Sequence, residues 1–146
     1  SRNLLLCGNF NMTNVDQIFN KVVEQGQHPR IYSDTFMILE QLGHALDCEH
    51  DRLFNLYKDE NLPGNELAKK IEDNLSIPNI LADNASLWDG GFVICGIVGS
   101  GDMFAIRDKN GIRPAFYYQD DEIVVVASER PVIQTVMNVT VDQVKE

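Results

Sequence analysis

Cysteine supplies the strongest nucleophile among protein side chains, and this sequence has three, Cys7, Cys48 and Cys95. A catalytic cysteine needs a thiolate, and therefore a nearby base or an electropositive setting. Cys95 lies instead in the apolar run "GFVICGIV", where neighbouring side chains raise the pKa of a thiol and hide the sulfur. We therefore predict that Cys95 is a core residue. A complete small enzyme that uses Cys95 as its nucleophile is the alternative.

The string "HALDCEHD" offers a second kind of chemistry, because His44, Cys48 and His50 are all types of metal ligand. His44 and Cys48 stand four positions apart and would share one face of a helix. A structural zinc site, however, needs a fourth ligand at a recognisable spacing, and the sequence offers none. An ordinary amphipathic helix is the favoured interpretation, and we predict no metal site.

The glycines of "GIVGSGDMF" raise the possibility of a phosphate-binding loop. Such a loop needs its glycines in a turn from a strand into a helix. Here they lead into "DMFAIRD", whose alternating pattern predicts a strand. We therefore predict a β-hairpin turn at residues 99–101.

The first half of the chain is predicted to be mainly helical. A short apolar run at residues 3–7 predicts a buried strand that stops at a turn, "GNFN". Asn14 is a good N-cap for a helix that ends near Gly26, and Ser33 or Asp34 begins a second helix that continues toward Tyr57. After the break at "LPG", further helices are predicted over residues 65–75 and from Pro78 onward.

From Gly90 onward the pattern is that of strands, and four of them are predicted to form a meander followed by a short helix. Asn110-Gly111 is the strongest hairpin signal, because a two-residue turn of the primed type needs positive φ at its centre. Helices segregated from an antiparallel sheet indicate an α+β fold.

Composition excludes several classes of function. The hydrophobic share of 44% is that of a globular protein, and the net charge of −10 is opposite to what nucleic acid or an anionic membrane surface would attract. An odd number of widely spaced cysteines argues against a disulfide framework, and no apolar run is long enough to span a membrane. We predict a cytoplasmic protein with no nucleic-acid or membrane partner.

Three separated segments together resemble one family. They are "LCGNFNMTN" (residues 6–14), "YSDTF" (residues 32–36), and "FAIRDKNGIRPAFYY" with "VVASER" (residues 104–118 and 125–130). They are similar to motifs of class II glutamine amidotransferases, and the third is similar to the signature of the amidophosphoribosyltransferase family. The resemblance implies part of an N-terminal nucleophile hydrolase fold, a four-layer αββα sandwich with antiparallel sheets.

The resemblance also implies roles for individual residues. Asn9 corresponds to the asparagine whose side-chain amide donates to the oxyanion formed on glutamine. Phe10 stands where the family usually has the glycine whose backbone N–H is the second donor, and Gly8 replaces a histidine. Asp34 corresponds to the carboxylate that holds the α-ammonium group of glutamine, and it is also a candidate N-cap. Asn9 as a plain turn residue is the alternative.

In the family the nucleophile is the first residue of the mature enzyme, with its own α-amine as base. The string "CGIVG" at Cys95 is similar to that N-terminus, but a residue within the chain has no free amine. We therefore expect residues 1–146 to be an internal part of the glutaminase domain. We expect it to lack both the nucleophile segment and the phosphoribosyltransferase domain, and hence to be inactive alone.

The parent enzyme would hydrolyse glutamine and use the ammonia to form phosphoribosylamine in purine biosynthesis. No cofactor is expected in this part, whereas the transferase domain would use Mg²⁺. Self-association through an uncovered sheet, or a homo-oligomer, is also expected. The alternative is a non-catalytic ligand-binding or assembly module that keeps a pocket at Asn9 and Asp34.

Overall fold

The structure, a computed structural model, describes residues 3–146. Its helices are α1 (Val15–Glu24), α2 (Asp34–Tyr57), α3 (Gly64–Asn74), α4 (Ile77–Ala85) and α5 (Arg130–Met137). Its strands are β1 (Leu4–Met12), β2 (Gly90–Val98), β3 (Met103–Arg107), β4 (Phe116–Gln119) and β5 (Val124–Ala127). Short 3-10 helices cover Lys58–Glu60 and Val141–Gln143.

Strands β1, β2 and β3 form an antiparallel sheet with β2 in the centre. β1 pairs with β2 without interruption, from Leu4 opposite Val98 to Met12 opposite Gly90. β2 and β3 are joined by the predicted hairpin turn, in which Gly101 has a φ of +100°. The α+β prediction with antiparallel strands is therefore confirmed.

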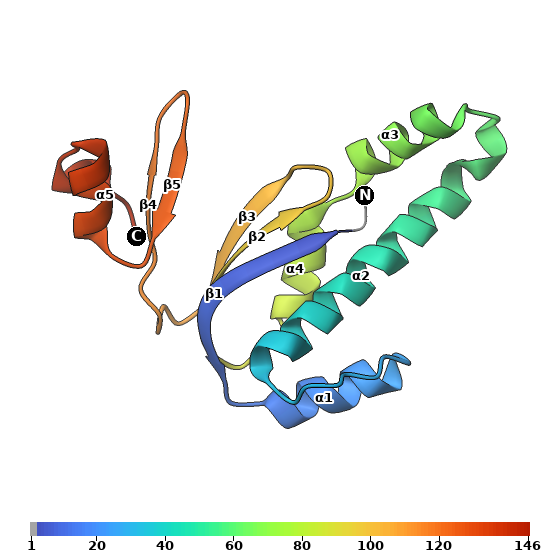
Figure 1. Cartoon of the computed structure of the whole chain (residues 1–146), viewed down its shortest axis with the longest axis horizontal. Coiled ribbons are helices and arrows are strands. Elements are labelled where there is room, and N and C mark those ends of the chain that lie inside the picture. The colour runs from blue at the N-terminus through green and yellow to red at the C-terminus, as the bar shows by residue number, and fades with distance from the viewer. Residues whose placement is uncertain (1–2) are drawn as a thin grey trace.

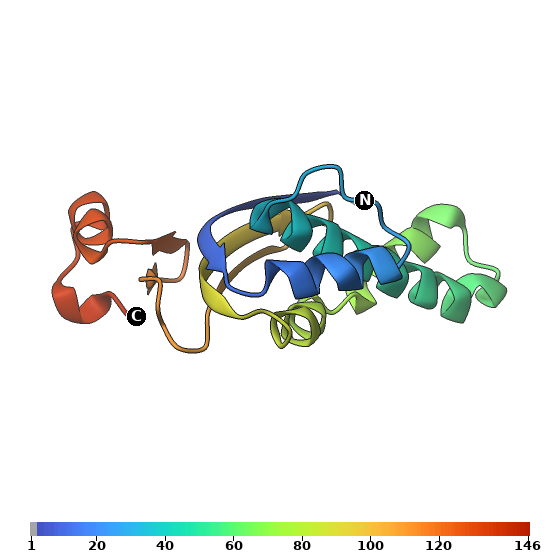
Figure 2. The ribbon, with the colours of Figure 1, turned by 90° about the horizontal axis from the view of Figure 1, so that it is seen from below.

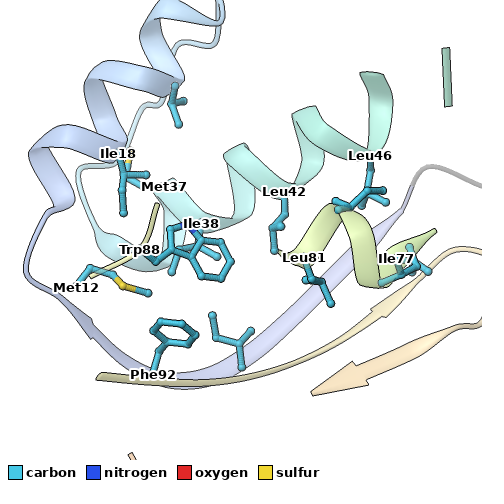
Figure 3. Packing of buried hydrophobic residues seen from close by; sticks show 14 residues of the cluster. Met12, Ile18, Met37, Ile38, Leu42, Leu46, Ile77, Leu81, Trp88 and Phe92 are labelled. Carbon is cyan, nitrogen blue, oxygen red and sulfur yellow. The ribbon is translucent and has the colours of Figure 1, made fainter. Parts of the chain in front are cut away.

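Helices α1, α2 and α4 gather on one side of this sheet (Figures 1 and 2). Figure 3 shows Phe92 of β2 pointing toward Trp88 and toward Ile38 of α2, with Met12 beside them. The Trp88 and Phe92 rings meet edge to face with centroids 5.4 Å apart. Trp88 also donates its indole N–H to Oε1 of Gln41 at 2.8 Å, which satisfies the one polar atom of a ring that is otherwise in apolar contact.

The opposite face of the sheet is open around Leu5 and Met103, whereas Ile112 covers it at Gly91, where an added Cβ would lie 2.7 Å from the Ile112 side chain. Leu5 and Met103 are 65% and 79% exposed on it. Cys95 lies on this face too and is only half-buried, so the prediction that it is a core residue is wrong. Side chains of a strand alternate between faces, and in β2 it is Ile94 that points to the helices. The helical layer and the sheet are two of the four layers that the family resemblance implies.

The predicted four-strand meander is also wrong. β4 and β5 form a separate two-stranded sheet, which packs with α5 at one end of the molecule (Figures 1 and 2). Lys145 extends it by an isolated bridge to Tyr117. β3 and β4 do not pair, because the chain between them folds into a loop of its own.

The helix boundaries follow the sequence signals closely. Gly26, with a φ of +81°, follows α1, and Ser33 caps α2 by accepting the N–H of Phe36 at 3.3 Å. α2 continues to Tyr57 as predicted. Within residues 3–146, no helix combines the length and the apolar character needed to cross a membrane.

Candidate functional site

Asn9 lies in the middle of β1 rather than in a turn. β1 runs to Met12, because each of its residues through "GNFN" has a partner in the nine-residue strand β2. Asn9 is exposed on the open face of the sheet, opposite Val93. Its side-chain amide has no hydrogen-bond partner within residues 3–146. The turn alternative is therefore wrong, and the amide is available to a ligand.

The backbone N–H of Phe10 points to the free edge of the sheet. Hydrogen bonds from Gly99 N to Asn3 O (2.8 Å) and from Thr13 N to Asp89 O (2.9 Å) lie at the two ends of the β1–β2 ladder. Residues of antiparallel strands alternate between bonded and non-bonded pairs, so the odd-numbered residues of β1 bond to β2 and Phe10 does not. Since β1 is an edge strand within residues 3–146, the N–H of Phe10 has no strand to pair with in this range.

The substitutions at positions 8 and 10 belong together. Both positions face the helices, and the Phe10 ring packs against the core. A Cβ added at Gly8 would lie 2.4 Å from the carbonyl oxygen of Val93 and 3.0 Å from Cδ1 of Phe10. The space for a side chain at position 8 is thus partly filled by the ring at position 10. Phe10 also has no positive φ, so a strained backbone does not arise there.

Asp34 is the first residue of α2, and Ser33, not Asp34, is its N-cap. One oxygen of the Asp34 carboxylate accepts the N–H of Thr35 at 2.8 Å. The preceding Tyr32 anchors this segment to α1, because its hydroxyl donates to Asp16 and its ring lies 5.5 Å from that of Phe19. Asp34 is half-buried, and its second carboxylate oxygen accepts no hydrogen bond from residues 3–146.

The structure brings Asn9 and Phe10 together on one strand, and places Asp34 on the helical side of the same end of the sheet. The packing of Ile38 near Met12 shows that α2 begins beside the end of β1 (Figure 3). Within the described chain, Asp34 does not bond to Asn9. A ligand joining the two would therefore have to reach around the edge of β1.

Thr13 and Asn14 fix this end of the sheet. The hydroxyl of Thr13 donates to the Asp89 carboxylate at 2.6 Å, and the Asn14 amide donates to the carbonyl of Leu87 at 2.8 Å. Asn14 also accepts the N–H of Asp89 at 3.0 Å. Asn14 precedes α1 as predicted, but its side chain makes no cap bond and joins the start of α1 to the start of β2.

Asp108, inside the string "RDKNGIRP", organises the loop between β3 and β4. It is 5% exposed, and its carboxylate accepts four backbone N–H groups. The donors are Ile112 at 2.9 Å, Asn110 at 3.0 Å, Arg113 at 3.1 Å and Phe92 at 3.3 Å. Burial, the largest single influence, raises the pKa of Asp108, but the four N–H groups together outweigh it and lower the pKa.

The side chain of Arg107 binds the backbone carbonyl groups of the same loop. Its guanidinium donates to Arg113 O at 2.6 Å and to Gly111 O at 2.9 Å, and it pairs with Glu146 at 3.0 Å. Gly111 has a φ of +63°, whereas Asn110 does not have the positive φ that a primed hairpin turn needs. The hairpin predicted at Asn110-Gly111 is therefore wrong, because adjacent acidic and basic side chains bind the loop backbone instead. An aspartate just before Asn-Gly is the local signal that could have indicated this.

Cys7 and Cys95 lie opposite each other on the open face of the sheet, and both are free thiols. Burial, and secondarily the neighbouring Cys7, raises the pKa of the Cys95 thiol, as its apolar neighbours predict. His44 and Cys48 do share a helix face, with Sγ 3.4 Å from Nε2. The described part of the chain groups no three His, Cys, Asp or Glu side chains that could hold a metal ion.

Comparisons with known proteins agree with one another. The sequence model for class II glutamine amidotransferases matches residues 70–145, just over half of the 146 residues. Among solved structures, a glutamine phosphoribosylpyrophosphate amidotransferase from B. subtilis, complexed with ADP and GMP, is similar in fold with a TM-score of 0.62 and 19% identity. The match covers 92% of this chain but only 23% of that one. No curated protein sequence matches.

Proposed function

The chain belongs to the class II glutamine amidotransferases, and we propose that it forms part of the glutaminase domain of an amidophosphoribosyltransferase-like enzyme. The observation that carries the proposal is that, within residues 3–146, neither the side-chain amide of Asn9 nor the neighbouring backbone N–H of Phe10 has a hydrogen-bond partner. Two neighbouring donors without protein acceptors are what an oxyanion hole requires.

In the proposed reaction a thiolate attacks the carboxamide carbon of glutamine, and negative charge develops on the carboxamide oxygen. Asn9 donates its side-chain N–H and Phe10 its backbone N–H to that oxygen. The base that took the proton of the thiol returns it to the carboxamide nitrogen, so that collapse of the intermediate releases ammonia and leaves an acyl enzyme that water hydrolyses to glutamate. Because the donors are already fixed in a strand, they need little reorganisation as the charge forms.

Asp34 is proposed to hold the α-ammonium group of glutamine by a charge-assisted hydrogen bond. Support comes from its position at the start of α2, where one carboxylate oxygen accepts the N–H of Thr35 and the other has no donor among residues 3–146. The anchoring of Tyr32 on α1 limits the movement of this segment.

The nucleophile is proposed to come from outside these residues, and the ammonia to be used on phosphoribosyl pyrophosphate by a separate, Mg²⁺-dependent domain in the cytoplasm. The raised pKa of Cys95 supports the first point, because it disfavours the thiolate. The chain spans about a quarter of the B. subtilis structure that it resembles, at 23%. A place for the enzyme in purine synthesis is proposed from the family resemblance alone.

The decisive experiment measures ammonia release from glutamine by the protein that contains this chain together with its nucleophile. Asn9→Ala is expected to lower kcat/KM by about 10²- to 10³-fold, the usual effect of losing one oxyanion donor. Asn11→Ala is the matched control, because Asn11 is exposed on the same face of β1 two residues further on. Equal activity of the two variants would refute the role of Asn9.

The Phe10 donor can be tested separately. Phe10→Pro removes the N–H, and a proline is tolerated at an edge where that N–H faces no strand. Phe10→Ala removes the same ring and keeps the N–H. The proline variant is expected to lose at least about tenfold more kcat/KM than the alanine variant. No difference between them would exclude the backbone donor.

Residues 1–146 alone are expected to release no ammonia from glutamine. Turnover that disappears in Cys95→Ala would replace this proposal with a small enzyme built on Cys95. The isolated chain is also expected to self-associate through the open sheet face around Leu5 and Met103. A monomer at high concentration in sedimentation would contradict that expectation.

A further inference from the structure

Gln41 and Trp88 form a buried polar contact between α2 and the segment that leads into β2. Both side chains are buried. The indole N–H donates to Oε1 of Gln41 at 2.8 Å, whereas Nε2 of Gln41 has no hydrogen-bond partner within residues 3–146. A buried donor without a partner costs free energy that an apolar side chain of similar size would not. What a glutamine adds here is direction, because a hydrogen bond fixes geometry and apolar contact does not.

The backbone on both sides of Trp88 is bound to the residues that directly follow β1. The Asn14 side chain donates to the carbonyl of Leu87 at 2.8 Å and accepts the N–H of Asp89 at 3.0 Å. The backbone N–H of Thr13 donates to the carbonyl of Asp89 at 2.9 Å. A movement of Trp88 would therefore also move the end of β1, the strand that carries both proposed oxyanion donors.

Gln41 and Asp34 lie on one stripe of α2. Seven residues make almost two full turns, so the two side chains leave the helix on the same side, about 10 Å apart along its axis. Met37 and Ile38 lie between them and are fully buried, and Ile38 packs beside Trp88 (Figure 3). A hydrogen bond that fixes Gln41 in the core therefore also fixes the rotation of α2, and with it the place of Asp34 in the first turn.

We infer that Gln41 and Trp88 are positioning residues of the glutamine site. Their hydrogen bond sets the spacing between Asp34 and the oxyanion donors on β1, and the inference rests on the function proposed above for those groups. The α-ammonium group and the carboxamide belong to one small molecule, so the protein must match both of its ends at once. A displacement of α2 by about 1 Å would leave the carboxamide oxygen away from its donors and lower the rate by up to about 10²-fold.

The test is a double-mutant cycle in the protein that contains this chain together with its nucleophile, with ammonia release from glutamine as the measurement. Gln41→Met removes the acceptor, keeps the apolar bulk, and is expected to lower kcat/KM at least about tenfold. In an Asp34→Asn background it should lower kcat/KM less than about twofold, because the α-ammonium group is no longer held and the spacing no longer matters. Trp88→Phe removes the donor instead and should give the same pattern.

Leu53→Ala is the matched control for lost packing in α2. Leu53 is buried near the C-terminal end of the helix, so its substitution destabilises the fold and leaves the spacing at Asp34 unchanged. It should act by the same factor with and without the Asp34 substitution. Circular dichroism and urea denaturation show whether each variant is folded under the conditions of the assay.

The outcomes separate this inference from the proposed function. Equal losses for Gln41→Met with and without the Asp34 carboxylate would show that Gln41 acts only through stability, and would overturn the inference. Full activity of both Gln41→Met and Trp88→Phe would overturn it as well, and would leave the roles of Asn9 and Asp34 intact. Full activity of Asp34→Asn by itself would instead refute the proposed binding of the α-ammonium group, and the inference with it.

Discussion

Asn9 and Asp108 both lie in short motifs that resemble the same family, but their side chains are in opposite environments. Asp108 is 5% exposed, and its carboxylate is saturated by four backbone N–H groups. Asn9 is exposed and its amide has no partner within residues 3–146. A polar group whose bonds are all made inside the chain stabilises the fold, whereas one with free donors can bind a ligand.

The part of the chain that matches the family model contains the structural residue Asp108 but not the proposed ligand-binding residue Asn9. The matched range, residues 70–145, contains the loop organised by Arg107 and Asp108 but neither Asn9 nor Asp34. The most specific part of the sequence resemblance is thus a structural clamp, and the residues proposed for chemistry lie before it. The strongest family signal in a sequence need not mark its active site.

The largest expected effect is at Asp108. Asp108→Ala leaves four backbone N–H groups, one of them buried and three partly buried, without their acceptor and should lower the free energy of unfolding by about 3 kcal/mol. Urea denaturation of the full chain measures it. The matched control is Asp120→Ala, because Asp120 accepts two turn N–H groups at 2.9 Å but is exposed, and its loss should lower the free energy of unfolding much less than Asp108→Ala. Equal losses would show that burial of Asp108 is unimportant.

The pH dependence of stability should follow from the same carboxylate. The pKa of Asp108 is lower in the folded state than in the unfolded state. The carboxylate therefore contributes fully to the stability of the fold above the unfolded-state pKa of about 4. It is lost as the pH falls through the folded pKa. The difference in free energy of unfolding between the unsubstituted chain and Asp108→Asn, measured by urea denaturation, should therefore be largest near neutral pH and become smaller below about pH 4. A gap that is constant from pH 7 to 3 would be inconsistent with this.

A smaller loss is expected at the strand that carries Asn9. Gly8→Ala places a Cβ 2.4 Å from the Val93 carbonyl, so β1 and β2 must separate slightly, at a cost of about 1–3 kcal/mol. Gly43→Ala in α2 is the control of opposite sign. The Cβ added at position 43 meets no atom within 4 Å, and the substitution should stabilise the helix by about 0.5–1 kcal/mol. Thermal denaturation of both variants distinguishes the two effects, and a neutral Gly8→Ala would mean that the strands move apart freely.

The smallest expected effect sharpens the contrast with Asp108. Asn9→Ala should change the free energy of unfolding by no more than about 0.5 kcal/mol, because the side chain makes no hydrogen bond within residues 3–146. Denaturation of the isolated chain tests this directly. A loss comparable to that of Asp108→Ala would place Asn9 among the structural residues and weaken the proposed oxyanion role.

Local signals in the sequence determined the helices of this protein. Gly26 and Ser33 mark helix ends that the structure confirms, because caps and glycine in the left-handed region act within a few residues. The same is true of the glycine turn between β2 and β3. The α+β class follows from the order of these elements.

Only the tertiary structure decided how the strands are used. The long partner β2 extends β1 through Gly8-Asn9-Phe10, against the preference of Gly and Asn for turns, because strand pairing satisfies the backbone of every residue that it includes. Arg107 and Asp108 turn a predicted hairpin into a bound loop. The face on which a strand residue lies depends on register, and register placed Cys95 outside the core and left the amide of Asn9 without a partner among residues 3–146.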